Sequence, residues 1–284
     1  MGREANGAVH VPLRVLSKAR RTGRRMSTAC QRQARRVRIA LSTWFRCGRH
    51  HVAEIDPFRL IWMDPWEPER LMDYTSPEFF EEVWDVRGGD WDLGRPRLED
   101  DGQYTSLMSH LRDGVPWKET PFIQEVLRRV AAGQRFWHGC RSKEEVEARC
   151  ERIDGLLKSI RRNGFRTQRE LEAEGVSVSR RSHPPELEEI VVNVDRNGKF
   201  IFANGIHRLV IARTLGLDRV PVCVLVRHRR WQEYRDSIVR DPFRGGGPSL
   251  DHPDLSYLLF DRRPVPPVGE VGGPGRRTVT EDRR

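Results

Sequence analysis

The stretch from Glu189 to Val226 restricts the fold of this sequence more than any other part of the chain. Its first segment, residues 190–194, alternates apolar and more polar side chains with the period of two that is typical of a half-buried strand. Asn197-Gly198 follows, and both residues tolerate the positive φ angles of a tight hairpin turn. Residues 199–202 are aromatic and β-branched, so we expect them to form the returning strand.

The second half of this stretch predicts a helix and a further strand. The chain breaks at Asn204-Gly205, and a helix is expected over Ile206–Leu215 with Gly216 as its end. Val220–Val226 is apolar without interruption, which is typical of a strand that is buried on both faces. The expected order is therefore strand, hairpin turn, strand, helix and strand.

Four residues at the start of this helix carry the clearest functional signal, Gly205-Ile206-His207-Arg208. A glycine where a strand turns into a helix lets the backbone approach a ligand closely. The first amides of a helix have no partner within it and carry the positive end of its dipole, so they suit a phosphate group. Asn204 would shape the turn, and His207 and Arg208 would add donors. The alternative is an ordinary helix start with a solvated Arg208.

Short motifs around this turn follow one another in a specific order. A helix that ends in glycine comes first, then an extended strand, a Phe-rich strand, the Gly-X-His-Arg turn, a helix with Leu-Gly and a closing Val-Pro-Val strand. The motifs are Leu156–Ile160, Asn163-Gly164, Ile190–Val194, Phe200–Phe202, Gly205–Arg208, Leu215-Gly216 and Val220–Val222. In this order, residues 153–226 resemble the superfamily of ParB N-terminal domains and sulfiredoxins. The resemblance implies an α+β fold in which a small mixed sheet packs with helices.

The sequence departs from this superfamily at its catalytic position. Sulfiredoxins carry a cysteine directly after the glycine, and ParB-type CTPases and related free-serine kinases carry a glutamate there. This sequence has Ile206 instead, so peroxiredoxin repair is not expected. The resemblance still implies a phosphate-binding turn at Gly205–Arg208. The implied ligand is a nucleotide (CTP, ATP or ADP, with Mg²⁺) or another phosphorylated small molecule, and an enzyme of this kind would catalyse phosphoryl transfer or nucleotide hydrolysis.

A glycine-rich loop, Gly88–Gly94, places the carboxylates of Asp90 and Asp92 on either side of Trp91. Phosphoryl transfer at a basic turn needs an acidic or metal counterpart. Asp90 and Asp92 are therefore the expected catalytic residues, as ligands of Mg²⁺ or as a general base. The alternative is an ordinary turn in which Trp91 fills the core.

The net charge of +10 is distributed unevenly along the chain. Residues 1–50 contain thirteen Lys or Arg and one acid, Glu4, whereas the other 234 residues carry a net charge of −2. We expect a largely disordered basic arm that contacts nucleic acid or an anionic surface, or that is simply a solvated tail. Within it, residues 28–47 have the pattern of a basic amphipathic helix. Met26 is an alternative to Met1 as the translation start.

Three further regions complete the expected organisation. Residues 51–150 hold six of the eight tryptophans and several helical patterns, which predicts a mainly helical, aromatic-rich layer that packs on the core. Residues 151–240 form the ParB/sulfiredoxin-like core that the resemblance implies. Residues 241–284 are rich in Gly and Pro, apart from the apolar segment 255–260, and are expected to be a mostly disordered tail.

The cysteines exclude two kinds of site. The five cysteines contain no Cys-x-x-Cys pair, so we expect reduced thiols and a cytoplasmic protein. His138 and Cys140, with Cys150 ten residues later, lack the spacing and the fourth ligand of a zinc site, so no metal site is expected. No apolar run reaches the ~18 residues of a membrane-spanning helix.

A second basic run, which contains Arg227, Arg229 and Arg230 beside Trp231, is the expected nucleic-acid contact, unless it is a solvated helix start. Three functions from different classes follow. The first is a nucleotide- or phosphate-binding domain. The second is a nonspecific DNA- or RNA-binding or regulatory protein in which the fold serves as a scaffold. The third is an interaction protein that presents the tryptophan-rich layer to a partner.

Overall fold

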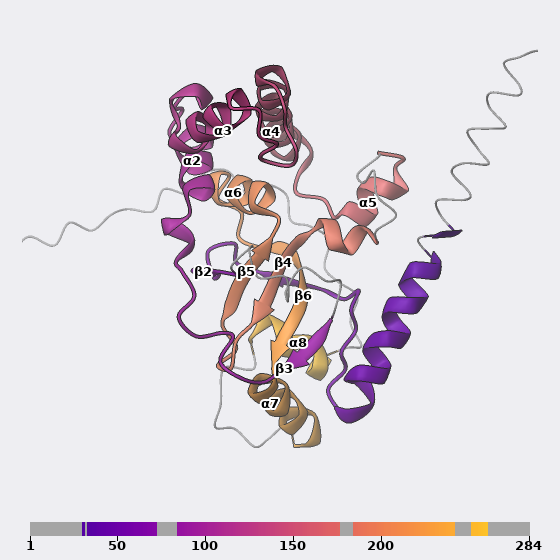
Figure 1. Ribbon diagram of the computed structural model, residues 1–284. Coiled ribbons are helices and arrows are strands. Elements are labelled where there is room, and N and C mark those ends of the chain that lie inside the picture. Colours follow the sequence, from indigo (N-terminus) through magenta and orange to yellow (C-terminus); the bar gives the residue numbers. More distant parts are fainter. Residues whose placement is uncertain (1–29, 32, 73–83, 177–183, 242–250, 261–284) are drawn as a thin grey trace, which may run out of the picture.

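The computed structural model describes residues 30–31, 33–72, 84–176, 184–241 and 251–260, and its elements form three layers (Figure 1). A mixed β-sheet lies in the middle. Helix α6 (Ile206–Thr214) packs on one side of the sheet, and α2 (Gly102–Leu111) and α4 (Lys143–Asn163) pack on α6 with α3 (Pro121–Ala131) between them. The helix at residues 33–46 lies against the other side. The predicted α+β class is confirmed, with parallel and antiparallel pairs in one sheet.

Six strands form this sheet within the described residues, in the order β1-β6-β4-β5-β2, and β3 pairs with the end of β6. The pairs β1–β6 and β4–β5 are antiparallel, and the pairs β4–β6, β2–β5 and β3–β6 are parallel. The strands are β1 (Leu60–Met63), β2 (Arg70–Leu71), β3 (Asp85–Arg87), β4 (Ile190–Val194), β5 (Phe200–Asn204) and β6 (Val220–His228).

The predicted hairpin between β4 and β5 is confirmed. The Asp195 carboxylate holds its turn by accepting hydrogen bonds from the amides of Asn197 at 2.7 Å and Lys199 at 2.8 Å. Gly198 has a φ of +89°, and a Cβ atom there would lie 2.5 Å from the ring of Trp231. Glycine is therefore required at this position both by the backbone conformation and by the close packing.

Side chains that the sequence places before helices cap them. Asp101 caps α2, Ser142 caps α4, and Thr167 and Glu170 form a capping box at α5. The helices are α2 (Gly102–Leu111), α3 (Pro121–Ala131), α4 (Lys143–Asn163), α5 (Gln168–Ala173), α6 (Ile206–Thr214), α7 (Arg229–Arg240) and α8 (Pro253–Phe260).

Both faces of the sheet are buried, which explains why β6 is apolar along most of its length. Val192 and Val224 face the larger hydrophobic cluster, which extends to α2, α3, α4 and α6. Val191 and Cys223, one residue earlier on each strand, face a smaller cluster that includes Ile39 from the helix at residues 33–46. The prediction that β6 is buried on both faces is confirmed.

Part of the basic arm is folded, in contrast to the expectation of a largely disordered segment. Residues 33–46 form a helix, as the amphipathic pattern predicted, and Arg36 pairs with Glu186 at 2.6 Å. Residues 1–29 lie outside the described residues. Among the helices that the structure describes, none is long and apolar enough to cross a bilayer.

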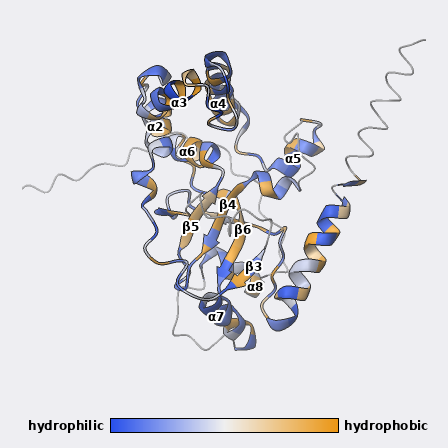
Figure 2. Cartoon of the chain, in the orientation of Figure 1, coloured by the Kyte–Doolittle hydropathy of each residue, from blue (hydrophilic) through white to orange (hydrophobic). Residues whose placement is uncertain are grey.

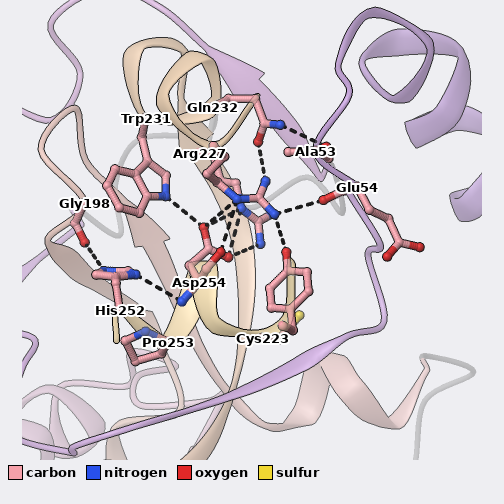
Figure 3. A network of polar contacts seen from close by, with 12 residues as sticks. Ala53, Glu54, Gly198, Cys223, Arg227, Trp231, Gln232, His252, Pro253 and Asp254 are labelled. Atoms are coloured by element: carbon pink, nitrogen blue, oxygen red, sulfur yellow. Dashed lines mark hydrogen bonds and ion pairs between the residues drawn. The ribbon is translucent and has the colours of Figure 1, made fainter. Parts of the chain in front are cut away.

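The C-terminal region returns to the fold through α8, which contains the apolar segment 255–260 that stood apart from the Gly- and Pro-rich tail in the sequence. Asp254 is fully buried, and its carboxylate accepts hydrogen bonds from Arg227 at 2.6 Å and from Trp231 Nε1 at 2.8 Å (Figure 3). Arg235 Nε lies 3.3 Å from the same carboxylate. His252 donates to the Gly198 carbonyl at 2.7 Å (Figure 3), which ties α8 to the β4–β5 turn.

Candidate functional site

The start of α6 is fixed by Gly205, which closes the connection from β5. Its φ of +91° and ψ of +31° are left-handed, and a Cβ atom would lie 2.9 Å from Ile190 Cα. The Asn204 carboxamide oxygen accepts the Gly205 amide at 2.8 Å, which shapes the turn as expected. The first intrahelical hydrogen bond runs from the Leu209 amide to the Gly205 carbonyl. The amides of residues 206–208 therefore point out of the helix end, which has no side-chain cap.

The Arg208 side chain points into the protein, which corrects the expectation that it binds a phosphate. Its Nη2 atom donates to Glu189 Oε2 at 2.9 Å and to the Arg166 carbonyl at 2.8 Å. The guanidinium lies over the Phe165 ring, 4.3 Å from the centroid, and only 7% of the residue is exposed. Arg208 therefore links α6 to residues 165–166 and to Glu189, and its positive charge is paired with the Glu189 carboxylate.

Glu189 is the second half of this internal contact. Its Oε1 atom accepts the Gln168 amide at 2.5 Å, so one buried carboxylate joins the start of α5 to α6. Burial raises the pKa of Glu189, and the Arg208 charge and the Gln168 amide act in the opposite direction. Ile206 is half-buried and packs on the core, so it adds only its backbone amide to the helix end.

His207 faces a different set of residues, at the junction of α6 with the helical layer. Its Nε2 lies 3.4 Å from Gln103 Nε2, near the start of α2. The rings of Trp137 and His138 each lie 6.3 Å from the His207 ring, centroid to centroid. Burial and the nearby charges of Arg149 and His138 lower the pKa of His207 to about 3, so its imidazole is neutral at physiological pH.

Arg149 on α4 completes this cluster with a half-buried positive charge. Its guanidinium lies over the Trp137 ring, 4.9 Å from the centroid. Within the described residues it forms no ion pair, and its Nε atom is buried without a hydrogen-bond partner. Burial lowers the pKa of Arg149. A guanidinium in this setting is an unused donor with an uncompensated charge.

The loop before α4 contributes Trp137, whose backbone has an uncommon conformation. Trp137 and His138 have φ angles of +46° and +64°, and Gly139 follows at +84°. The Phe136 amide donates to the Cys140 carbonyl at 3.1 Å, which closes the loop. Trp137 is 7% exposed, and its indole Nε1 is buried without a partner among the described residues. Backbone strain of this kind is frequent in ligand-binding loops.

The site therefore offers hydrogen-bond donors from three parts of the chain. The amides of residues 206–208 carry the positive end of the α6 dipole. Arg149 Nε and Trp137 Nε1, which have no hydrogen-bond partner among the described residues, belong to side chains near His207. This set fits an acceptor-rich anion. It does not fit Mg²⁺, which prefers carboxylate oxygens, and the described residues contain no group of three or more His, Cys, Asp or Glu that could hold a metal.

The structure separates Asp90 and Asp92 from this site, which corrects their expected role beside the basic turn. Asp92 accepts hydrogen bonds from Arg196 Nε at 2.8 Å and Nη2 at 2.7 Å, and Asp90 accepts from the same Nη2 at 2.7 Å. Arg196 lies in the β4–β5 turn, at the opposite end of β5 from Gly205. Five residues of strand, about 16 Å, separate the two ends.

Asp92 is a structural carboxylate in this position. Burial acts to raise the pKa of Asp92, but the hydrogen bonds from Arg196 outweigh it and lower the pKa to about 2. A carboxylate that is paired in this way is a poor general base at neutral pH. The pairing instead fastens the loop at residues 88–94 to the hairpin turn, as the alternative interpretation of an ordinary turn expected.

The arginines of the second basic run differ in their exposure to solvent. Arg227 is buried in the contact with Asp254, so it cannot reach nucleic acid, and its expected role is wrong for this physical reason. Arg229 and Arg230, at the start of α7, are exposed. Both expected roles of these two residues, a nucleic-acid contact and a solvated helix start, stay predictions.

Sequence reasoning missed the residues from the helical layer. Val146, Cys150 and Ile153 form the apolar stripe of α4, and Arg149 falls at the i+3 position of that stripe. A charged residue on an apolar stripe is a signal that the sequence did contain. Gln103 and Trp137 carried no such signal, because their approach to His207 depends on how α2 and the 136–140 loop pack on α6.

Comparisons of this chain with protein-family models, with characterised proteins and with solved structures find no match.

Proposed function

We propose that this chain binds a phosphate-bearing small molecule, such as a nucleotide, at the N-terminus of α6. The anionic oxygens of the ligand would lie against the amides of residues 206–208, and Arg149 and Trp137 would donate from the side. His207 would gain a proton when the anion binds, because a nearby negative charge favours the imidazolium form.

One observation carries this proposal, the two buried donors without partners beside the helix end. Arg149 Nε and Trp137 Nε1 are each buried within the described residues and neither is hydrogen-bonded. A buried donor that stays unsatisfied costs about 1–3 kcal/mol. A phosphate group in its ionised form consists almost entirely of acceptors, so it would satisfy these donors and offset the charge of Arg149 together.

The resemblance to ParB N-terminal domains and sulfiredoxins supports the position of this site, but not every residue that we propose to contact the phosphate. The Gly-Ile-His-Arg turn is the part of the sequence that the resemblance associates with phosphate. Arg208 is paired with Glu189, so we propose that Arg149 contacts the phosphate instead of Arg208. We propose binding without phosphoryl transfer, since Asp90 and Asp92 lie at the other end of the hairpin.

Isothermal titration of the full chain tests this proposal with inorganic phosphate, ADP, ATP and CTP, each with and without Mg²⁺. Arg149→Met keeps the length of the side chain and removes the charge. It is expected to weaken binding by about tenfold to about a hundredfold, the loss of a charge-assisted hydrogen bond. Arg161→Met, twelve residues later on the same helix and exposed, is the matched control and is expected to bind as the wild type does.

Two results would contradict the proposal. The first is a wild-type chain that binds none of these ligands at millimolar concentration. The second is equal binding by the wild type and the Arg149→Met variant, which would place any phosphate site elsewhere on the molecule.

A further inference from the structure

The helix at residues 33–46 has one face in the core of the protein. Ile39 and Thr43, one turn apart, are buried, and Cys47 continues this row beyond the helix end. Arg36 lies on the same side, where it pairs with Glu186 and covers the Phe58 ring at 4.0 Å. These contacts fix which side of the helix faces outward.

A row of large apolar side chains lies on the outward side. Val37, Leu41, Trp44 and Phe45 are spaced at i, i+4, i+7 and i+8, which is one face of an α-helix. Each is between 49% and 55% exposed, although aromatic and aliphatic side chains of this size are usually buried. Trp44 and Phe45 form an edge-to-face pair with centroids 4.9 Å apart. We call these four residues the outer stripe.

The outer stripe lies beside exposed positive charge. Arg38, Arg46 and Arg49 are all exposed, and Figure 2 shows hydrophilic and hydrophobic residues on the same helix. The first 50 residues carry a net charge of +12, whereas the rest of the chain carries −2. The positive charge is therefore concentrated at the helix and in the residues before it.

We propose that the outer stripe docks this protein on an anionic membrane surface. A helix with Trp, Phe and Leu on one face and arginines beside it is suited to lie in the interface, with its apolar face among the acyl chains and its charges at the headgroups. The helix is about 21 Å long, so it lies flat on one leaflet. The core face stays in place during docking, because the outer stripe points away from it.

Charge and side-chain shape favour an anionic membrane as the partner over a second copy of the chain and over a nucleic acid. A second copy of the chain would bring another arm of +12 against the first, which opposes association. A nucleic acid would use the arginines, but Val37 and Leu41 have no ring on which a base could stack. An anionic bilayer satisfies the charge and buries the apolar row together.

Co-sedimentation of the full chain with vesicles tests the proposal. One set contains phosphatidylcholine alone, and the other contains phosphatidylcholine with about 30% phosphatidylserine. We expect the protein to bind the anionic vesicles, and its affinity to fall as salt rises. The double variant Leu41→Gln with Trp44→Gln should bind about tenfold to about a hundredfold more weakly, because less apolar surface enters the membrane.

The matched control is Leu93→Gln, which changes a side chain of similar exposure, 54%, in the loop beside Arg196. It is expected to bind vesicles as the wild type does. Thermal unfolding of each variant verifies that the exposed substitutions leave the fold intact. The proposal is overturned if anionic vesicles do not bind at low salt, or if the double variant binds them as tightly as the wild type. Binding of duplex DNA in place of vesicles would overturn it as well.

Discussion

Replacing Arg208 with methionine is expected to destabilise the fold while the folded protein still binds phosphate. The change leaves Glu189, which is 1% exposed, with a buried charge and only the Gln168 amide as its described donor. It also removes the contact between the guanidinium and the Phe165 ring. Removing one partner of a buried ion pair costs about 3–5 kcal/mol, a large part of a typical folding free energy of about 5–15 kcal/mol.

The companion variant separates charge from packing. Arg208→Met combined with Glu189→Gln removes both charges and keeps an acceptor for the Gln168 amide. We expect this double variant to recover at least about half of the lost free energy, because an uncharged pair avoids the desolvation of the carboxylate. It also provides a folded protein without Arg208 if the single variant does not fold.

The loss of folding stability in Arg208→Met is expected to depend on pH. Burial already raises the pKa of Glu189, and removing Arg208 raises it further. A carboxyl whose pKa is higher in the folded state binds more protons there than when unfolded, so its contribution to stability is lost as pH rises. The difference between the variant and the wild type should therefore be smaller at about pH 5 than at about pH 8.

Urea unfolding at both pH values, with phosphate titration of the folded variants, measures these effects. The reasoning is refuted if Arg208→Met costs less than about 0.5 kcal/mol and abolishes phosphate binding. That result would mean that Arg208 faces the ligand and that the contact with Glu189 is not what holds it.

Two further predictions concern other buried charges. Asp254→Asn should lower the free energy of unfolding in urea by about 3–5 kcal/mol, because it leaves Arg227 buried without its counter-charge. The exposed control Asp218→Asn should change it by less than about 0.5 kcal/mol. Equal losses of stability in the two variants would contradict this prediction. Sulfate, whose charge is constant over the range, should bind more tightly as pH falls from about 8 to about 5, because the bound anion raises the depressed pKa of His207. Calorimetry should show that His207→Gln removes this dependence, and an unchanged profile would exclude His207 from the site.

The sequence predicted the local parts of the fold well. The alternating residues of β4, the Asn-Gly turn and the apolar run of β6 gave the hairpin and the buried strand, because each signal lies within a few residues. Burial on both faces was predicted for β6 alone, from its apolar run. The expectation that β4 is half-buried was wrong, because all five of its residues are buried.

Long-range ion pairs could not be predicted in this way. Arg196 and Asp92 are 104 residues apart, and Arg227 and Asp254 are 27 apart. Charged residues are exposed in most proteins, so a sequence pattern favours a solvated or ligand-binding role unless the partner is known. Only the three-dimensional packing shows that Asp92 holds a turn and that Arg208 holds Glu189.

The candidate site was predicted in part. The glycine turn and the helix amides were placed correctly, because a strand that ends in Asn-Gly before a helix is a local feature. Arg149 was missed, although its position on the apolar stripe of α4 was visible in the sequence. The reason is that tertiary packing sets the approach of α4 to α6. The side-chain donors of the site therefore come from the helical layer, which was assigned from its sequence to packing or to contact with a partner.

The position of a bound anion is the decisive test of whether the start of α6 binds phosphate. Crystals of the full chain grown with tungstate, a heavy analogue of phosphate, would reveal the anion by its anomalous scattering. We expect tungstate oxygens at about 3 Å from the amides of residues 206–208 and from the Arg149 guanidinium. An anion bound at Arg229 and Arg230, with none at the start of α6, would contradict it.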